Sequence, residues 1–270
     1  MIGQKNLSAA LNNHIDNGFP RFTIFVGPEG SGKKEIAKYI GNKLGYTTAY
    51  YGIGVDDVRQ MIDNAYKTAM PIVYVLPDAD KMSPAAKNAL LKVTEEPPQR
   101  AYFILTLTDL SNTLGTIKSR GTVFYMDPYT QGEIDEYYHN NYPSFADERK
   151  IVDEICSTPG EVDKLVEMGT TSFYEYVEKV VDNIAVVSGS NSFKIAQQIK
   201  LKESDTDKYD LKLFWKTFMS ICSLRLRTDP IKYSDGIKIT SKYLQELRIT
   251  GINKASAVDM WILDIRKAWL

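Results

Sequence analysis

A glycine-rich segment that ends in two lysines is the first place where residue types and spacing suggest chemistry. Its eight residues fit the pattern GxxxxGK: Gly27, Pro28, Glu29, Gly30, Ser31, Gly32, Lys33 and Lys34. Glycines allow backbone N–H groups to turn toward phosphate oxygens, and the ammonium group of Lys33 would reach the outer phosphates of a nucleotide. The pattern predicts a nucleotide-binding loop; the alternative is a glycine-rich turn that binds nothing.

Two positions that should hold magnesium carry unsuitable residues. The residue after Lys33 is normally Ser or Thr, whose hydroxyl binds the metal, but here it is Lys34, which adds positive charge. The strand predicted at 72–76 should be followed by an Asp and then by a Glu, but Pro77 and Asp78 occupy these positions. We therefore expect that ATP or ADP can bind, that no Mg²⁺-dependent hydrolysis takes place and that the loop holds no metal.

The composition excludes several other classes of protein. The chain has 270 residues, a formal charge of −1 and 43% hydrophobic residues, enough for two or three domains with real cores. Cys156 and Cys222 are far apart and lack metal-ligand spacing, so we expect no zinc, no disulfide scaffold and a cytoplasmic location. No apolar run approaches the roughly 18–20 residues of a membrane helix, which predicts no membrane association.

The glycine-rich loop must be positioned by the elements around it, and these alternate over the first 126 residues. Near-continuous apolar runs predict central strands of a parallel sheet at 21–26, 72–76, 102–106 and 122–125. Amphipathic stretches predict helices between them, at 33–44, 56–68 and 83–94. Ser83 and Pro84 form a good helix start. The pattern predicts an α/β doubly wound domain, with the loop between its first strand and the following helix.

The rest of the chain is predicted to be helical. After Asp127-Pro128, helices are expected at 131–140, 146–156 and 161–167, with a break at 157–160. Helices continue from about residue 171, with a polar interruption at 202–210. The last helix places an apolar face at helical spacing, made of Val258, Trp261, Ile262, Ile265 and Trp269.

Several segments, in this order, resemble the clamp-loader subunits of the AAA+ class, and among them the delta-prime subunit of bacterial DNA polymerase III. The most specific are 78–98, which reads DADKMSPAAKNALLKVTEEPP, and 116–120, which reads TIKSR. The opening Ile2-Gly3-Gln4 and the strand at 103–108 are also similar to family motifs. The resemblance implies an AAA+ P-loop domain at 1–126, a small helical lid at 127–168 and an all-α collar for oligomerisation at 169–270.

The resemblance also implies a function and a site residue. Such subunits assemble with other clamp-loader subunits and open a sliding clamp at primer–template DNA during replication. Arg120 matches the family's arginine finger, which acts on the ATP of the neighbouring subunit, whereas Gly160 stands where active subunits carry a lid arginine. This combination implies a stator that does not hydrolyse ATP. The alternatives are an ATP-hydrolysing motor subunit and a stand-alone P-loop regulator, and for Arg120 itself a loop cap or a partner for a carboxylate.

Two departures and one weaker indication complete the sequence-based expectations. Gly121 replaces the family's cysteine after Arg120, and the segment 45–70 lacks the four-cysteine zinc module of many relatives. Ser83 and Lys87 lie on a helix that in the family faces duplex DNA, so they are candidate DNA contacts. A solvated helix face explains the lysines of this helix equally well.

Overall fold

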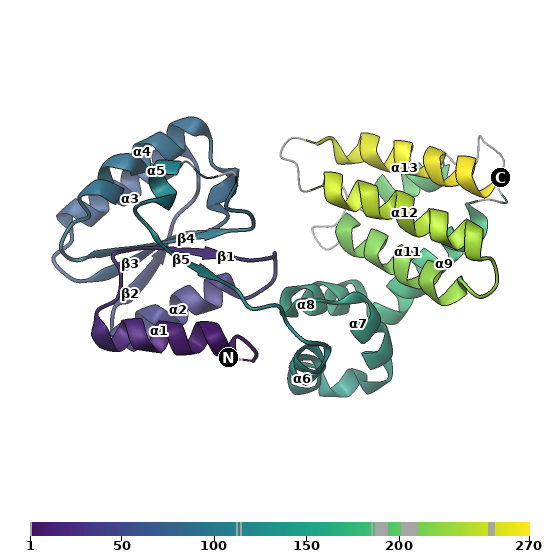
Figure 1. The fold of residues 1–270 in the computed structure, drawn as a ribbon, viewed down its shortest axis with the longest axis horizontal. Helices are drawn as coiled ribbons and strands as arrows, with labels where there is room; N and C mark the ends of the chain where they lie inside the picture. Colours follow the sequence, from purple (N-terminus) through teal and green to yellow (C-terminus); the bar gives the residue numbers. More distant parts are fainter. Residues whose placement is uncertain are drawn as a thin grey trace. The chain divides into compact units, whose positions relative to one another are not determined.

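The computed structural model describes residues 2–111, 113, 115–184, 186, 194–200, 210–247 and 252–270. These residues form two compact units, Met1–Glu133 and Ile134–Leu270, shown in Figure 1. Most of the polar segment expected at 202–210 lies outside the described residues, which resume at Asp210. No helix in the described part of the chain is long and apolar enough to span a membrane.

The first unit is built on a five-stranded sheet with the order β2-β3-β4-β1-β5, in which all neighbouring strands are parallel. Its strands are β1 (Phe22–Val26), β2 (Thr47–Tyr50), β3 (Ile72–Leu76), β4 (Ala101–Leu107) and β5 (Thr122–Tyr125). The predicted parallel α/β sheet is confirmed. Strand β2 was not predicted, because its sequence TTAY lies at a sheet edge and lacks a run of buried apolar residues.

Helices cover both faces of this sheet, which makes a three-layer unit (Figure 1). Residues of α1 (Lys5–Asn17) and α2 (Lys33–Leu44) pack in one apolar core, and residues of α3 (Val55–Lys67), α4 (Pro84–Glu95) and the short α5 (Gly115–Lys118) pack in the other. Ser83 caps α4 by accepting a hydrogen bond from the backbone N–H of Ala86 at 3.2 Å, as its sequence predicts. Helix α1 was not predicted, because it buries only Leu7 and Leu11.

The second unit is helical, and its elements in chain order are α6 (Gln131–Asn141), the 3₁₀-helix η2 (Pro143–Glu148), α7 (Arg149–Ile155), α8 (Pro159–Met168), α9 (Thr170–Asn183), α11 (Leu211–Arg225), α12 (Pro230–Glu246) and α13 (Lys254–Trp269). Residues 194–200 are also helical. The helix expected at 146–156 is therefore divided between η2 and α7. The expected break between two helices is confirmed, but it is shorter than 157–160, because α7 ends at Ile155 and α8 already begins at Pro159, with Thr158 as its cap.

The core of this unit contains the apolar face predicted for the last helix. Trp261 and Ile265 are completely buried and Trp269 is 9% exposed, which confirms the prediction. The indole N–H of Trp261 donates a hydrogen bond to the hydroxyl of Thr240 at 2.9 Å, so its polar atom is satisfied. The rings of Phe214, Trp215 and Phe218 on α11 pack around Trp261.

Candidate functional site

The glycine-rich loop connects the end of β1 to the start of α2, and its glycines are required by the backbone. Gly30 and Gly32 have φ of 76° and 84°, in the left-handed region that favours glycine. A Cβ atom on Gly27 would lie 2.4 Å from Cγ of Met126, so only glycine fits there without displacing the neighbour. The loop therefore has the strand-loop-helix context that its sequence predicts.

Lys33, the candidate phosphate ligand, is bonded to the loop itself. Lys33 is 6% exposed, and its Nζ donates hydrogen bonds to the carbonyl oxygens of Gly27 and Pro28, both at 2.7 Å. The hydroxyl of Ser31 donates to the same Pro28 carbonyl at 2.7 Å. To bind a phosphate, Lys33 would exchange these carbonyl oxygens for phosphate oxygens.

A tyrosine that the sequence did not single out packs against this loop. The hydroxyl of Tyr129 donates a hydrogen bond to the carbonyl oxygen of Ser31 at 3.0 Å, and burial raises the pKa of Tyr129. Its segment is fixed by Gln4, whose side chain donates to the carbonyl of Asp127 at 2.7 Å and accepts from its N–H at 2.8 Å. The chain terminus, the segment after β5 and the loop are thus joined by hydrogen bonds.

The turn after β3 is the place where a P-loop ATPase would carry magnesium ligands. In this chain it is held by two threonines, one in β4 and one just after it. The N–H of Asp78 donates to the hydroxyl of Thr106 at 3.1 Å, and Asp78 itself has a left-handed φ of 53°. Asp80 is 9% exposed and accepts a hydrogen bond from the hydroxyl of Thr108. Pro77 offers no side-chain ligand. Among the described residues, no group of three or more His, Cys, Asp or Glu side chains could hold a metal ion.

Arg120 lies at the opposite end of the sheet from the glycine-rich loop. It precedes β5, whose Thr122 is paired with Thr23 of β1, so Arg120 is near the level of Arg21. The loop begins at Gly27, six residues further along β1. At about 3.3 Å per residue, the backbones of Arg120 and the loop are separated by roughly 20 Å along the strand direction.

The guanidinium of Arg120 has two partners within its own unit. Nη2 lies 2.8 Å from Oε1 of Glu95, and Nη1 donates to the carbonyl of Thr116 at 3.0 Å. The side chains of Arg120 and Glu95 are 33% and 55% exposed, and ion pairs this accessible contribute about 0–1 kcal/mol. These are the loop-cap and carboxylate contacts of the alternative interpretation.

The residues on either side of Arg120 are fixed by local packing. The segment 116–120 begins within the one-turn helix α5 and is therefore not a simple turn. A Cβ atom on Gly121 would lie 2.8 Å from Cδ1 of Ile24. Glycine in place of the family's cysteine thus allows the chain after Arg120 to approach β1 closely.

Ser83 is the cap that precedes α4, Lys87 lies in the first half of this helix, and Glu95 ends it. Ser83 is exposed and Lys87 half-buried, while Lys81 and Lys92 are exposed. Because α4 has 12 residues, its two ends are about 18 Å apart. Ser83 and Lys87 therefore lie about 18 Å and about 12 Å along the helix axis from Glu95, the partner of Arg120.

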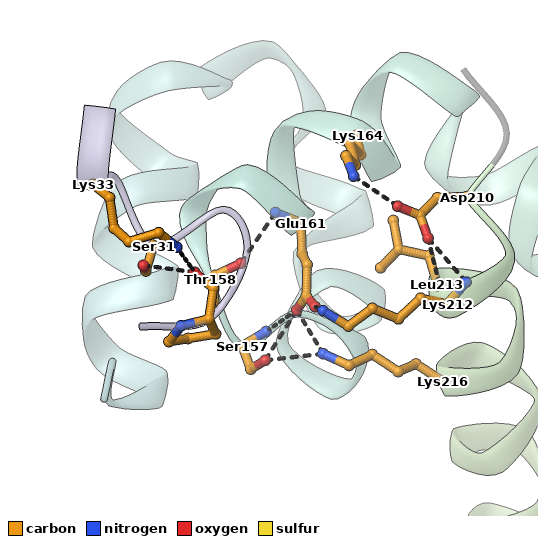
Figure 2. A network of polar contacts seen from close by, with 11 residues as sticks. Ser31, Lys33, Ser157, Thr158, Glu161, Lys164, Asp210, Lys212, Leu213 and Lys216 are labelled. Carbon is orange, nitrogen blue, oxygen red and sulfur yellow. Dashed lines mark hydrogen bonds and ion pairs between the residues drawn. The ribbon is translucent and has the colours of Figure 1, made fainter. Parts of the chain in front are cut away.

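Helix α8 contains Gly160, the residue that stands in place of the lid arginine. The next residue, Glu161, is a buried glutamate that the sequence did not single out. The carboxylate of Glu161 is 6% exposed and lies 2.9 Å from Nζ of Lys212 and 2.6 Å from Nζ of Lys216 (Figure 2). The backbone N–H of Ser157 also donates to it, at 2.9 Å. Burial alone would raise the pKa of Glu161, but the two lysines and these hydrogen bonds outweigh it and lower this pKa to about 2.

Residues 46–130 match a family model described as DNA polymerase III, delta subunit. The DNA polymerase III delta-prime subunit of Yersinia pestis is 43% identical over 77 residues, which are 27% of this chain and 23% of the relative. The gamma/tau subunit of Mycobacterium bovis is 29% identical over 154 residues, 44% of this chain and 27% of the relative. The matched regions span only about a quarter of these relatives.

Two solved structures have similar folds over nearly the whole chain. A DNA polymerase III gamma subunit-related protein from Thermotoga maritima has a TM-score of 0.58 and 16% identity, covering 97% of this chain and 99% of that one. A mutant of RuvB from Thermotoga maritima has a TM-score of 0.51 and 16% identity, covering 96% of this chain and 83% of that one. At this identity the similarity concerns the fold, and it confirms the expected P-loop α/β domain followed by helices.

Proposed function

We propose, from the relation of this chain to the AAA+ clamp-loader subunits of DNA polymerase III, that it is a stator of such a loader and supplies Arg120 to a neighbour's ATP site. It would assemble with other clamp-loader subunits and act with them on a sliding clamp and primer–template DNA in the cytoplasm. ATP would be hydrolysed on the neighbouring subunit, where an arginine finger stabilises the charge that develops on the transferred phosphoryl group.

The observation that carries this proposal is the position of Arg120 relative to its own loop. With about 20 Å of sheet between them, Arg120 is too far from the loop to contact a nucleotide bound there. Its side chain is partly exposed, so a second molecule can approach it. An arginine of this kind acts on phosphate only when a neighbour presents one.

The state of the chain's own loop supports the absence of hydrolysis. Lys34 and Pro77 replace two magnesium ligands, Gly160 replaces the lid arginine, and Lys33 is bonded to backbone carbonyls. Backbone N–H groups and Lys33 can still hold ATP or ADP without a metal. The proposal therefore includes nucleotide binding without turnover, and neither zinc nor magnesium as a cofactor.

The decisive experiment is a loader reconstituted with its native partners and carrying Arg120→Ala in this subunit alone. We expect the DNA-stimulated ATPase rate to fall at least about tenfold, which corresponds to roughly 1.4 kcal/mol of barrier, while assembly on gel filtration is unchanged. Arg59→Ala is the matched control, because Arg59 is an exposed arginine of the same unit that also pairs with a carboxylate, that of Asp56, at 3.6 Å. Intact assembly with an unchanged rate would overturn the proposal.

Two simpler measurements separate the alternatives. The isolated chain should hydrolyse ATP only at background rates, and a magnesium-dependent turnover abolished by Lys33→Ala would favour the motor subunit. Purification of the native protein with its partners should recover other loader subunits or the clamp, whereas a stand-alone regulator would purify without them.

If Ser83 and Lys87 contact DNA, Lys87→Ala should weaken DNA binding and reduce its dependence on salt.

A further inference from the structure

The guanidinium of Arg120 is held along only part of its hydrogen-bonding edge. Arginine has five N–H donors, and in the structure one N–H of Nη1 binds the Thr116 carbonyl and one N–H of Nη2 binds Glu95. The other three N–H groups have no hydrogen-bond partner among the described residues. A phosphoryl group can contact these three N–H groups while the guanidinium keeps its bonds to Thr116 and Glu95.

Glu95 is well placed to fix the side chain of Arg120, because its own backbone is held by a helix. It is the last residue of α4, and the next residue, Glu96, donates its N–H to the carbonyl of Lys92 at 3.2 Å. The hydroxyl of Tyr66 on α3 reaches the carbonyl of Glu96 at 3.4 Å. The carboxylate of Glu95 therefore projects from a backbone that two contacts hold in place.

We infer that Glu95 is a positioning residue for Arg120, holding its guanidinium ready for the phosphoryl oxygens of a nucleoside triphosphate bound to the neighbouring subunit. This inference rests on the proposed function and names a residue that controls the same site. A side chain that is oriented in advance loses less freedom in the transition state, and small displacements of such groups reduce rates strongly. Glu95 acts through Arg120 and does not touch the substrate.

The contact with Glu95 is not arranged to block access of another molecule to Arg120. The pair uses a single N–H of Nη2, whereas a closed carboxylate–arginine pair uses two parallel bonds. More than half of the Glu95 side chain is exposed, so water and salt weaken its attraction for Arg120. A neighbour's phosphate therefore does not need to displace Glu95 to reach the remaining N–H groups.

The test measures the ATPase of the reconstituted loader with three variants of this subunit. Glu95→Ala should lower kcat about fivefold and leave the KM for ATP unchanged, because the arginine acts on charge that develops in the transition state. Glu95→Gln should restore most of the rate, since its amide oxygen still accepts the N–H of Arg120. Glu96→Ala, which changes the exposed neighbour at the same helix end, should have no effect.

The combination with Arg120→Ala distinguishes the possible failures. Adding Glu95→Ala to Arg120→Ala should cause no further loss, because Glu95 acts only through this arginine. Two results would overturn the inference while Arg120→Ala still lowered the rate: an unchanged or faster rate in Glu95→Ala, or a further fall of about fivefold when Glu95→Ala is added to Arg120→Ala. If Arg120→Ala itself had no effect, the arginine-finger proposal would be wrong and the role of Glu95 with it.

Discussion

Lys33 and Arg120 lie at opposite ends of one sheet and differ in burial and in how much of the charged group is bonded within the chain. Lys33 is 6% exposed, and its ammonium group is bonded to two carbonyls of its own loop. The side chain of Arg120 is 33% exposed, and its two contacts use part of the guanidinium. One cation therefore stabilises the fold, whereas the other has N–H groups available to another molecule.

The contacts of the loop show what its motif contributes to the fold itself. The glycines of the loop are still demanded by its backbone, as the close approach of Gly27 to Met126 shows. A lysine in this loop can satisfy buried carbonyls when it does not bind phosphate. The motif in the sequence thus indicates the fold more securely than it indicates the chemistry.

Glu161 is a third charged residue with strong internal contacts, and its replacement should have the largest effect on the free energy of unfolding. Its pKa falls from an ordinary 4.5 to about 2, which corresponds to about 3 kcal/mol of stability. This stability is present above about pH 4.5 and is lost as the pH falls through 2, because the carboxylate is protonated there. Urea unfolding at pH 7 should show Glu161→Gln to be less stable by about 3 kcal/mol.

The difference between Glu161→Gln and the parent protein should shrink as the pH is lowered from 4.5 to 2, since glutamine resembles the protonated acid. Glu167→Gln is the control, because Glu167 is exposed on the same helix. If the deficit of Glu161→Gln were the same at every pH, the ion pairs with Lys212 and Lys216 would not be its source.

Replacing each cation by methionine tests the contrast between Lys33 and Arg120 directly. Lys33→Met leaves the buried carbonyl of Gly27 without its partner and should cost about 1–2 kcal/mol of unfolding free energy. Arg120→Met removes an exposed pair and should cost less than about 1 kcal/mol. Urea titrations of the two isolated variants measure both values. A larger loss for Arg120→Met would reverse the roles given to the two residues.

The smallest expected effect concerns the tyrosine at the loop. Tyr129→Phe removes the hydrogen bond to the carbonyl of Ser31 and should lower the unfolding free energy by about 1 kcal/mol. Tyr50→Phe is a matched control, because the Tyr50 hydroxyl also donates to a backbone carbonyl, that of Lys34, from a side chain that is 47% exposed. Equal losses in the two variants would mean that burial at Tyr129 adds nothing to the bond.

The elements predicted best are those whose local sequence is sufficient to define them. The predicted strands at 72–76 and 122–125 match β3 and β5, and the helix at 33–44 matches α2. By contrast, Thr158-Pro159 begins α8 with the same hydroxyl-and-proline pattern that correctly placed the start of α4 at Ser83-Pro84. The predicted helix at 161–167 therefore starts two residues too late, since the same pattern was not applied at Thr158-Pro159.

The partners of the site residues could not be predicted in the same way. Glu95 precedes Arg120 by 25 residues, and Glu161 is 55 residues from Lys216. Such pairs depend on how helices pack, which local periodicity does not determine. The sequence offered one usable indication for Tyr129: a tyrosine directly after Asp127-Pro128, where the chain leaves the last strand.

The ion pairs between α8 and α11 also determine how these two helices align. Glu161 of α8 meets Lys212 and Lys216 of α11, while Lys164 of α8 meets Asp210, the cap of α11, at 2.8 Å. The charges thus cross, negative to positive in one pair and positive to negative in the other. Because Lys212 and Lys216 are one turn apart, sliding α11 by one turn, about 5.4 Å, would leave Glu161 beside one lysine only and would separate Lys164 from Asp210. Apolar residues in these places would fill the same space without this penalty, so the crossed charges favour the observed register.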